Sequence, residues 1–475
     1  MIKTNNLIFL LFFIVLLVVL IIFFTSYNKQ TMLGRGEGWN VLLITVDALR
    51  PDHLGCNKYL RDTSPTIDYL ASQGIMFENA HSQSPHTHTS IASLMTSTYP
   101  IRHRSVVGSR PLSKDAITLA EILRDNHYRT GAFVQNYWLT EKLGFGQGFE
   151  EYNQLGPTEL SNAVVEDSII TWLASNDDRP FFLWLHYLEP HATYLPRRKY
   201  LDEFIPEYEG KDWAFTNEML TDIRRSHKTL KPQALTYIKA CYDSEIRWCD
   251  TAINRILDSL SQSGLRSRTL IVFLSDHGEE FQDHGSLGHD HTLYEELLHV
   301  PLVFHAPSVL QKNIRLSETI ETVDVLPTVL EFLGIEIPEE VQGGSLLRLI
   351  AGEDSVEPDL AFAQRYFYRR ESHLVSVLDY PWKMIVQVLD IDRSDFHNWS
   401  LDPERCQVQL YNLENDPKEQ RDISFQNESK VSNLFRKLQL WAEQSQNINI
   451  IKRFDEKPLE DENLKEKLKS MGYLQ

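Results

Sequence analysis

Acidic and histidine side chains stand at the ends of three strongly apolar segments of the sequence. NVLLITVD ends at Asp47, and TLIVFLSDH ends at Asp276 and His277. PFFLWLHYL contains His186 near its end, and His191 follows shortly after it. Open α/β sheets bind ligands at the carboxyl ends of their strands, so such ends favour a shared site. A single aspartate at a strand end more often caps a turn, and a single loop histidine is usually solvated. Three such ends together favour a binding site.

Asp47, Asp276 and His277 offer two carboxylates and an imidazole, which is a ligand set for a divalent cation. This combination of donors suits Zn²⁺ or Mn²⁺ and suits Ca²⁺ less, because Ca²⁺ prefers a larger shell of oxygens. The chain has a net charge of −19. An acidic protein that handles an anionic substrate needs a local positive charge, which a metal ion supplies. The sequence therefore predicts one divalent ion, with Mn²⁺ or Zn²⁺ favoured and Ca²⁺ as the alternative.

Thr87 lies between His86 and His88, just before an apolar helical run, in HSQSPHTHTSIASLMTSTYP. A hydroxyl that coordinates a metal has a lowered pKa and becomes a nucleophile, so Thr87 is the candidate fourth ligand and nucleophile. The alternative role is a helix cap, because threonine and serine favour that position, although Ser90 can serve there equally well.

The composition is that of an ordinary globular protein, with 42% hydrophobic and 24% charged residues among 475. No basic run or stripe is present, which excludes a nucleic-acid partner. Residues 7–24 are uninterrupted apolar residues, near the length that spans a bilayer. We expect residues 1–29 to be an uncleaved membrane anchor rather than a signal sequence, because no Ala-x-Ala site follows. We expect the catalytic domain to lie outside the cytoplasm.

Strand-like and helix-like segments alternate through most of the chain, which predicts an α/β fold with a large, mostly parallel sheet and helices on both faces. The expected strands are residues 40–47, 130–135, 180–188, 269–276 and 300–306. The expected helices are residues 65–73, 117–126 and 234–262. The pattern changes near residue 350, where a hairpin turning at Asp379, Tyr380 and Pro381 is followed by a helix at 431–444. We expect a catalytic domain at 38–350 and a smaller α+β subdomain at 351–475.

Several of these segments resemble those of the sulfatase family of the alkaline phosphatase superfamily, across nearly the whole chain after residue 38. The segments are ITVDALRPDHLG, SPHTHTSIASLMTSTYP, FFLWLHYLEPHATYLP and SDHGEEFQDHG with GHDHTLYEELLHVPLVF, and weaker ones are TVDVLPTVLEFLGI, QGGSLLRLI, LYNLENDPKEQRDIS and LKSMGYL. The resemblance implies a role for each candidate residue. The metal ligands are Asp47, Thr87, Asp276 and His277; the catalytic residues are Thr87, His191 and His289; and the substrate-binding residues are His186 and His291.

The sequence departs from the family pattern at three positions. Typical members carry a cysteine or serine, converted to formylglycine, where this chain has Thr87, and an arginine where it has Ile91. The usual second aspartate of the first strand is Ala48. We therefore expect no formylglycine. The remaining set resembles the metal site of lipoteichoic acid synthases and phosphoethanolamine transferases, which use a metal-bound threonine directly.

The predicted function is metal-dependent hydrolysis of sulfuric or phosphoric esters by Thr87, with a glycan or a lipid head group as the substrate class. A membrane-anchored phosphoryl transferase of the phosphoethanolamine or phosphoglycerol type is an alternative, and so is a decayed scaffold that only binds. A two-metal phosphodiesterase ranks below these, because its second metal has only His186, Glu189, His191 and His289 to bind it.

Overall fold

The structure is a computed structural model. It describes residue 466 and residues 36–446, apart from 107–109, 156–161, 176, 207, 209–216, 227, 308, 353–359, 367–372 and 390–400. The predicted membrane anchor at residues 7–24 lies outside the described residues and stays a prediction. Among the helices that are described, none has the length and apolar character needed to cross a membrane.

An eight-stranded sheet forms the centre of the molecule, with the strand order β10-β2-β9-β6-β1-β5-β3-β4. Its strands are β1 (Asn40–Val46), β2 (Ile75–His81), β3 (Arg129–Val134), β4 (Glu151–Gln154), β5 (Phe181–Tyr187), β6 (Thr269–Ser275), β9 (His299–His305) and β10 (Ile314–Glu321). All neighbours pair in parallel except β9, which is antiparallel to both β2 and β6. β1 and β6 are buried along their whole length, as expected for strands covered on both faces.

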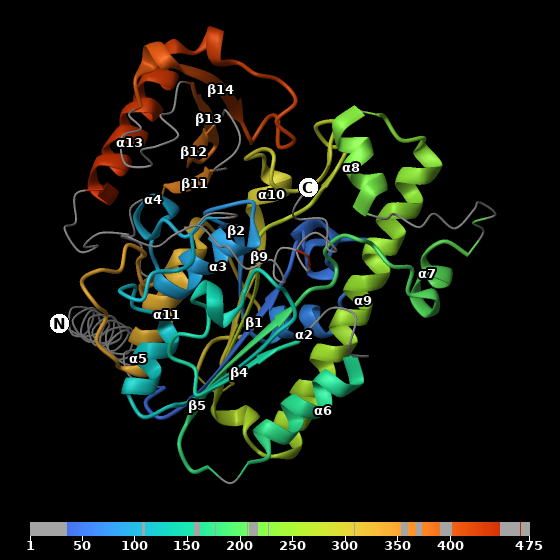
Figure 1. Ribbon diagram of the computed structural model, residues 1–475, viewed down its shortest axis with the longest axis vertical. Helices are drawn as coiled ribbons and strands as arrows, with labels where there is room; N and C mark the ends of the chain where they lie inside the picture. The colour runs from blue at the N-terminus through green and yellow to red at the C-terminus, as the bar shows by residue number, and fades with distance from the viewer. Residues whose placement is uncertain are drawn as a thin grey trace, which may run out of the picture.

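Helices cover the two faces of this sheet (Figure 1). One face carries α3 (Thr87–Thr96), α5 (Leu119–Asp125), α11 (Val325–Leu333) and α12 (Leu347–Ile350). The other face carries α2 (Pro65–Gln73), α6 (Asn162–Leu173) and the long α9 (Pro232–Gln262). Alternate residues of β1 belong to the two cores, since Val41 and Leu43 face one and Leu42 and Ile44 face the other.

A smaller antiparallel sheet follows in the order β11-β12-β13-β14. Its strands are β11 (Ala361–Arg365), β12 (His373–Asp379), β13 (Trp382–Val388) and β14 (Cys406–Asn412), and α13 (Glu428–Gln446) packs on it. Short elements complete the described part, namely α4 (Pro100–His103), α7 (Arg198–Phe204), α8 (Asn217–Ser226), α10 (Glu295–Leu298), β7 (Glu280–Phe281) and β8 (Leu287–Gly288). The predicted fold class is confirmed, whereas the predicted domain boundaries stay predictions.

Candidate active site

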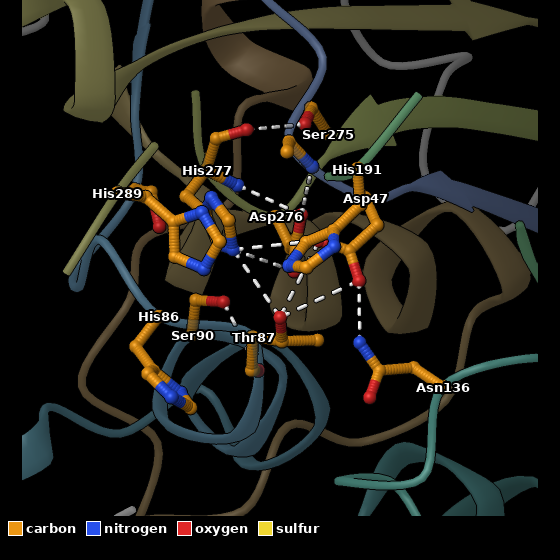
Figure 2. Close-up of polar contacts among 12 residues, drawn as sticks. Asp47, His86, Thr87, Ser90, Asn136, His191, Ser275, Asp276, His277 and His289 are labelled. Atoms are coloured by element: carbon orange, nitrogen blue, oxygen red, sulfur yellow. Dashed lines mark hydrogen bonds and ion pairs between the residues drawn. The ribbon is translucent and has the colours of Figure 1, made fainter. Parts of the chain in front are cut away.

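The candidate site lies at the carboxyl edge of the central strands, where α3 begins (Figure 2). β1 pairs in parallel with β5 on one side and with β6 on the other, and Val46 is in register with both Tyr187 and Ser275. This register brings Asp47, which follows β1, next to Asp276, which follows β6. The structure thus brings together the strand ends that the sequence singled out.

Thr87 is the first residue of α3, and its hydroxyl points into the acidic cluster. Its Oγ1 lies 3.4 Å from each carboxylate oxygen of Asp47 and 3.2 Å from His277 Nε2. All three residues are fully buried. His86 is the N-cap of α3, because its Nδ1 accepts a hydrogen bond from the backbone N–H of His88 at 3.3 Å. His86 therefore fills the capping role that was the alternative for Thr87.

The two residues after β6 are held in fixed orientations by the backbone. Asp276 Oδ1 accepts the N–H groups of Ala48 at 3.2 Å and His277 at 2.9 Å. Its Oδ2 is buried and has no hydrogen-bond donor among the described residues. His277 donates Nδ1–H to the carbonyl of Gly278 at 2.8 Å, which leaves the lone pair of Nε2 directed at the cluster. A histidine oriented in this way is prepared to bind a metal.

Asp47 is fixed by two further side chains at Oδ2. Asn136 donates its amide N–H to this oxygen at 2.5 Å, and His186 Nε2 lies 3.4 Å from it. Ligand atoms of Asp47, His186 and Asp276 lie within 4.8 Å of one another. His186, predicted to bind substrate, is thus placed in the cluster that fits a metal.

The electrostatics of the cluster also fit a cation. Burial, followed by the charge of Asp47, raises the pKa of Asp276 to about 6. Burial opposes ionisation of Asp47 too, but the charge of His191 and the contacts with His186 and His277 lower its pKa overall. An unpaired, buried carboxylate oxygen beside a second carboxylate is costly without a positive charge between them. The donor set and the unsatisfied Oδ2 therefore fit a divalent ion.

Further histidines surround the cluster on its outer side. The ring centre of His289 lies 4.4 Å from that of His277 and 4.8 Å from that of His191. His289 Nδ1 is hydrogen-bonded to the fully buried Glu279 at 2.9 Å, and His191 donates Nδ1–H to the carbonyl of Ala192 at 2.6 Å. The two rings therefore lie side by side on the outer side of the cluster, with His289 against His277.

His291, the remaining predicted substrate residue, is engaged elsewhere. Its Nε2 contacts the Glu280 carboxylate, and its Nδ1 lies 2.9 Å from the carbonyl of His289. Two of the three departures from the family pattern are also explained by position. Ile91 is fully buried in the core beneath α3. Ala48 adopts a left-handed backbone with φ of 57°, and its N–H donates to Asp276.

Asn136 and Glu279 belong to the site although the sequence did not single them out. Asn136 comes two residues after β3, and Glu279 comes two residues after His277. The position of Asn136 just after a strand was the available signal, since polar residues at strand ends had already identified Asp47. Glu279 carried a weaker signal, because an acidic residue in a loop is ordinarily solvated.

Comparison with known proteins agrees with this geometry. A sequence model described as Sulfatase matches residues 39–335, and one described as N-sulphoglucosamine sulphohydrolase, C-terminal, matches residues 283–447. An arylsulfatase of Clostridium perfringens is 27% identical over 450 residues, covering 80% of this chain and 89% of that protein. The multifunctional alkaline phosphatase superfamily protein PehA of Trinickia caryophylli is 26% identical and covers 66% of this chain and 77% of that protein.

Solved structures share the fold. A protein in complex with its substrate D-glucosamine-2-N,6-O-disulfate matches with a TM-score of 0.73 at 19% identity, covering 88% of this chain and 100% of that one. The phosphonate monoester hydrolase of Agrobacterium radiobacter matches with a TM-score of 0.69 at 21% identity, covering 86% of this chain and 96% of that one. The Sulfatase match alone spans more than half of the sequence. The chain therefore belongs to the sulfatase family of ester hydrolases within the alkaline phosphatase superfamily.

Proposed function

We propose that this protein is a metal-dependent hydrolase of sulfate or phosphate esters in which the hydroxyl of Thr87 is the nucleophile. One observation carries the proposal: Thr87 Oγ1 lies within 3.4 Å of both Asp47 oxygens and 3.2 Å from His277 Nε2. A threonine is not a substrate for conversion to formylglycine, so the hydroxyl itself has to form the covalent bond. Nucleophilic catalysis of this kind divides one difficult displacement into two easier ones.

The residues that would hold the metal are Asp47, Thr87, Asp276 and His277, with His186 in contact with Asp47. When bound, a divalent cation lowers the pKa of a coordinated hydroxyl and neutralises negative charge in the transition state. The donor set favours Mn²⁺ or Zn²⁺ over Ca²⁺. Asn136 supports metal binding indirectly, because its amide holds Asp47 in place.

Side chains of the protein carry out the bond-forming and proton-transfer steps. The Thr87 hydroxyl releases its proton to solvent, and its oxygen bonds to sulfur or phosphorus while the bond to the alcohol oxygen breaks. His191, whose Nδ1–H is held by Ala192, gives its Nε2 proton to the departing alcohol oxygen. Burial and the charge of His277 lower the pKa of His289 well below its usual range. His289 is therefore neutral at neutral pH, and its Nε2 accepts a proton from the water that attacks the threonine ester and frees Thr87.

The relatives point to a substrate class. Two related Bacteroides thetaiotaomicron proteins are named N-acetylglucosamine-6-O-sulfatase and Delta 4,5-hexuronate-2-O-sulfatase. These names support an ester on a sugar as the substrate of this chain. The phosphonate monoester hydrolase neighbours keep phosphorus esters as the second class to assay.

The test is to trap the covalent intermediate. Metal-stripped protein is resupplied with Mn²⁺, Zn²⁺ or Ca²⁺ and mixed with nitrophenyl sulfate, nitrophenyl phosphate or bis(nitrophenyl) phosphate. Acid-quenched samples are then digested for mass spectrometry. We expect a metal-dependent sulfo or phospho group on Thr87 and an otherwise unmodified threonine. Turnover without any adduct on the peptide that carries Thr87 would contradict the proposal, and transfer of the group to an added alcohol instead of water would identify a transferase.

Removal of the Asn136 amide should weaken metal binding. In Asn136→Ala, Asp47 Oδ2 loses its 2.5 Å donor, so the carboxylate is no longer fixed for coordination. We expect the affinity for Mn²⁺ to fall by about 10–100-fold, as for other residues that orient ligands, measured by calorimetric titration of metal-stripped protein. The control is Asn153→Ala, because the side chain of Asn153 bonds only the carbonyl of Ala132 on β3, at 3.3 Å, within the described part of the chain. Equal affinities in both variants would show that Asp47 does not need this support to bind metal.

A further inference from the structure

Arg224, on α8, reaches across the short strand β8 toward the outer side of the site. Its Nε donates to the carbonyl of Leu287 at 2.6 Å. The guanidinium packs on Gly288 so closely that a Cβ added there would lie 1.9 Å from Nη2 and 2.6 Å from Cζ. Gly288 also has a φ of 82°, so only glycine fits this position without strain. Arg224 is thereby fixed beside residue 288, next to His289.

The terminal nitrogens of Arg224 have no hydrogen-bond or ion-pair partner within the described part of the chain. This sets Arg224 apart from arginines such as Arg50, Arg197 and Arg255, which each pair with a carboxylate. The charge of Arg224 acts on the buried groups around it, which include His289 and Glu279. A cation that is held in place and has no partner among the described residues, in a protein of net charge −19, is a recognition element for an anion.

The position of Arg224 indicates which part of a substrate it meets. His277 contacts Thr87, His289 packs on His277, and Arg224 packs on the residue before His289. Arg224 therefore lies one layer farther from the nucleophile than His289. Glu279 is fully buried, with one oxygen bonded to His289, whereas Arg224 is partly exposed. A group that enters from solvent thus meets the guanidinium before it meets this carboxylate.

We infer that Arg224 binds a second anionic group, carried on the alcohol part of the substrate. The substrate class is then an ester whose alcohol bears its own carboxylate, sulfate or phosphate, as a charged sugar does. This inference rests on the proposed function, because the alcohol side is defined relative to Thr87. The planar guanidinium has spare N–H groups for a bidentate pair with such an oxyanion.

The test compares a nitrophenyl ester with the same ester carrying a ring carboxylate. In Arg224→Met we expect kcat/KM for the carboxylated ester to fall by about 10–100-fold, mainly through KM, as for loss of a charged hydrogen-bonded pair. The ester without the ring carboxylate should be turned over as by the wild type, which also shows that the variant is folded. Arg224→Lys keeps the charge but loses the planar guanidinium. Its kcat/KM for the carboxylated ester should lie between those of the wild type and Arg224→Met. Arg198→Met, on α7, is the matched control, because Arg198 pairs with Asp202 and is exposed.

Equal losses for both esters in Arg224→Met would overturn the inference, since they would show that Arg224 only braces the β7–β8 hairpin or serves the transferred group. A second measurement needs no turnover. The carboxylated nitrophenol, which is the free alcohol, is titrated calorimetrically into the wild type and Arg224→Met, and we expect about 10-fold weaker binding by the variant. Undiminished binding would also overturn the inference. If binding is lost while no ester is turned over by the wild type, the proposed function fails and the anion site stands.

Discussion

Thr87→Ala is expected to lose essentially all ester hydrolysis, with kcat reduced on the order of 10⁴-fold or more, as for other enzymes deprived of their nucleophile. The alanine removes the hydroxyl that contacts Asp47 and His277. Thr87→Ser keeps a hydroxyl at the start of α3 and should retain measurable turnover. The measurement is steady-state hydrolysis at saturating metal, because the hydroxyl is also a proposed ligand and its loss should weaken metal binding.

Thr96→Ala is the control for this series. Thr96 is a buried threonine at the other end of α3, and within the described residues its hydroxyl bonds only the carbonyl of Ala92 and the hydroxyl of Thr98. Thr96→Ala therefore shows how much activity is lost when a threonine hydroxyl is removed from α3 without any change in the acidic cluster. Wild-type rates in Thr87→Ala would rule out Thr87 as the nucleophile. The decayed-scaffold alternative is favoured if, in addition, the wild type shows no metal-dependent turnover.

Long apolar runs made the centre of the fold predictable. β1, β5 and β6 lie within one or two residues of their predicted bounds, and the hairpin turns at Asp379–Pro381 as expected. β2 and β10 were missed, because IMFENAH and IRLSETIE mix polar with apolar residues and β10 is half exposed. The antiparallel direction of β9 was also unpredictable, since an apolar run carries no information on direction.

The part of the site that depends on residue type and on position at a strand end was predictable from the sequence. Asp47, Asp276 and Thr87 meet as expected, because parallel strands end at one edge. The placement of His186 depends on register, which puts it opposite Thr45, with its Nδ1 2.8 Å from that hydroxyl. Its Nε2 is therefore turned to Asp47 and not outward to a substrate. A single sequence does not contain the register of strands that are far apart along the chain.

A buried lysine joins the small sheet to the loop that carries Thr87, and the sequence pattern alone would have placed it in solvent. Lys383 on β13 is 1% exposed, and its Nζ lies 2.8 Å from Glu295 and 2.9 Å from Glu419. Glu295 also bonds His81, the last residue of β2, at 3.0 Å. The loop that leads to Thr87 begins directly after His81. This network therefore couples the position of the small sheet to the nucleophile loop.

Lys383→Met is expected to destabilise the protein by about 3–5 kcal/mol, because it leaves the buried carboxylate of Glu419 and the largely buried carboxylate of Glu295 without their cation. The measurement is urea unfolding followed by tryptophan fluorescence, which Trp382 beside the substitution should report. Lys437→Met is the matched control. Lys437 pairs with Asp379 at 2.7 Å on the same subdomain, but the pair is partly exposed, and such pairs contribute about 0–1 kcal/mol. Combining Lys383→Met with Glu419→Gln should recover part of the loss.

The loss of stability in Lys383→Met should also depend on pH. Burial raises the pKa of Glu419 to about 7 even though Lys383 lowers it, and removal of the lysine can only raise this pKa further. A carboxyl whose pKa is raised by folding is neutral at low pH, and its ionisation costs stability as the pH rises through the folded pKa. The stability difference from the wild type should therefore be smallest near about pH 5 and should widen above about pH 7, whereas Lys437→Met should show no such widening. A difference that stays constant with pH would mean that the buried carboxylates do not cause the loss, and that the lysine stabilises the sheet through the packing of its side chain.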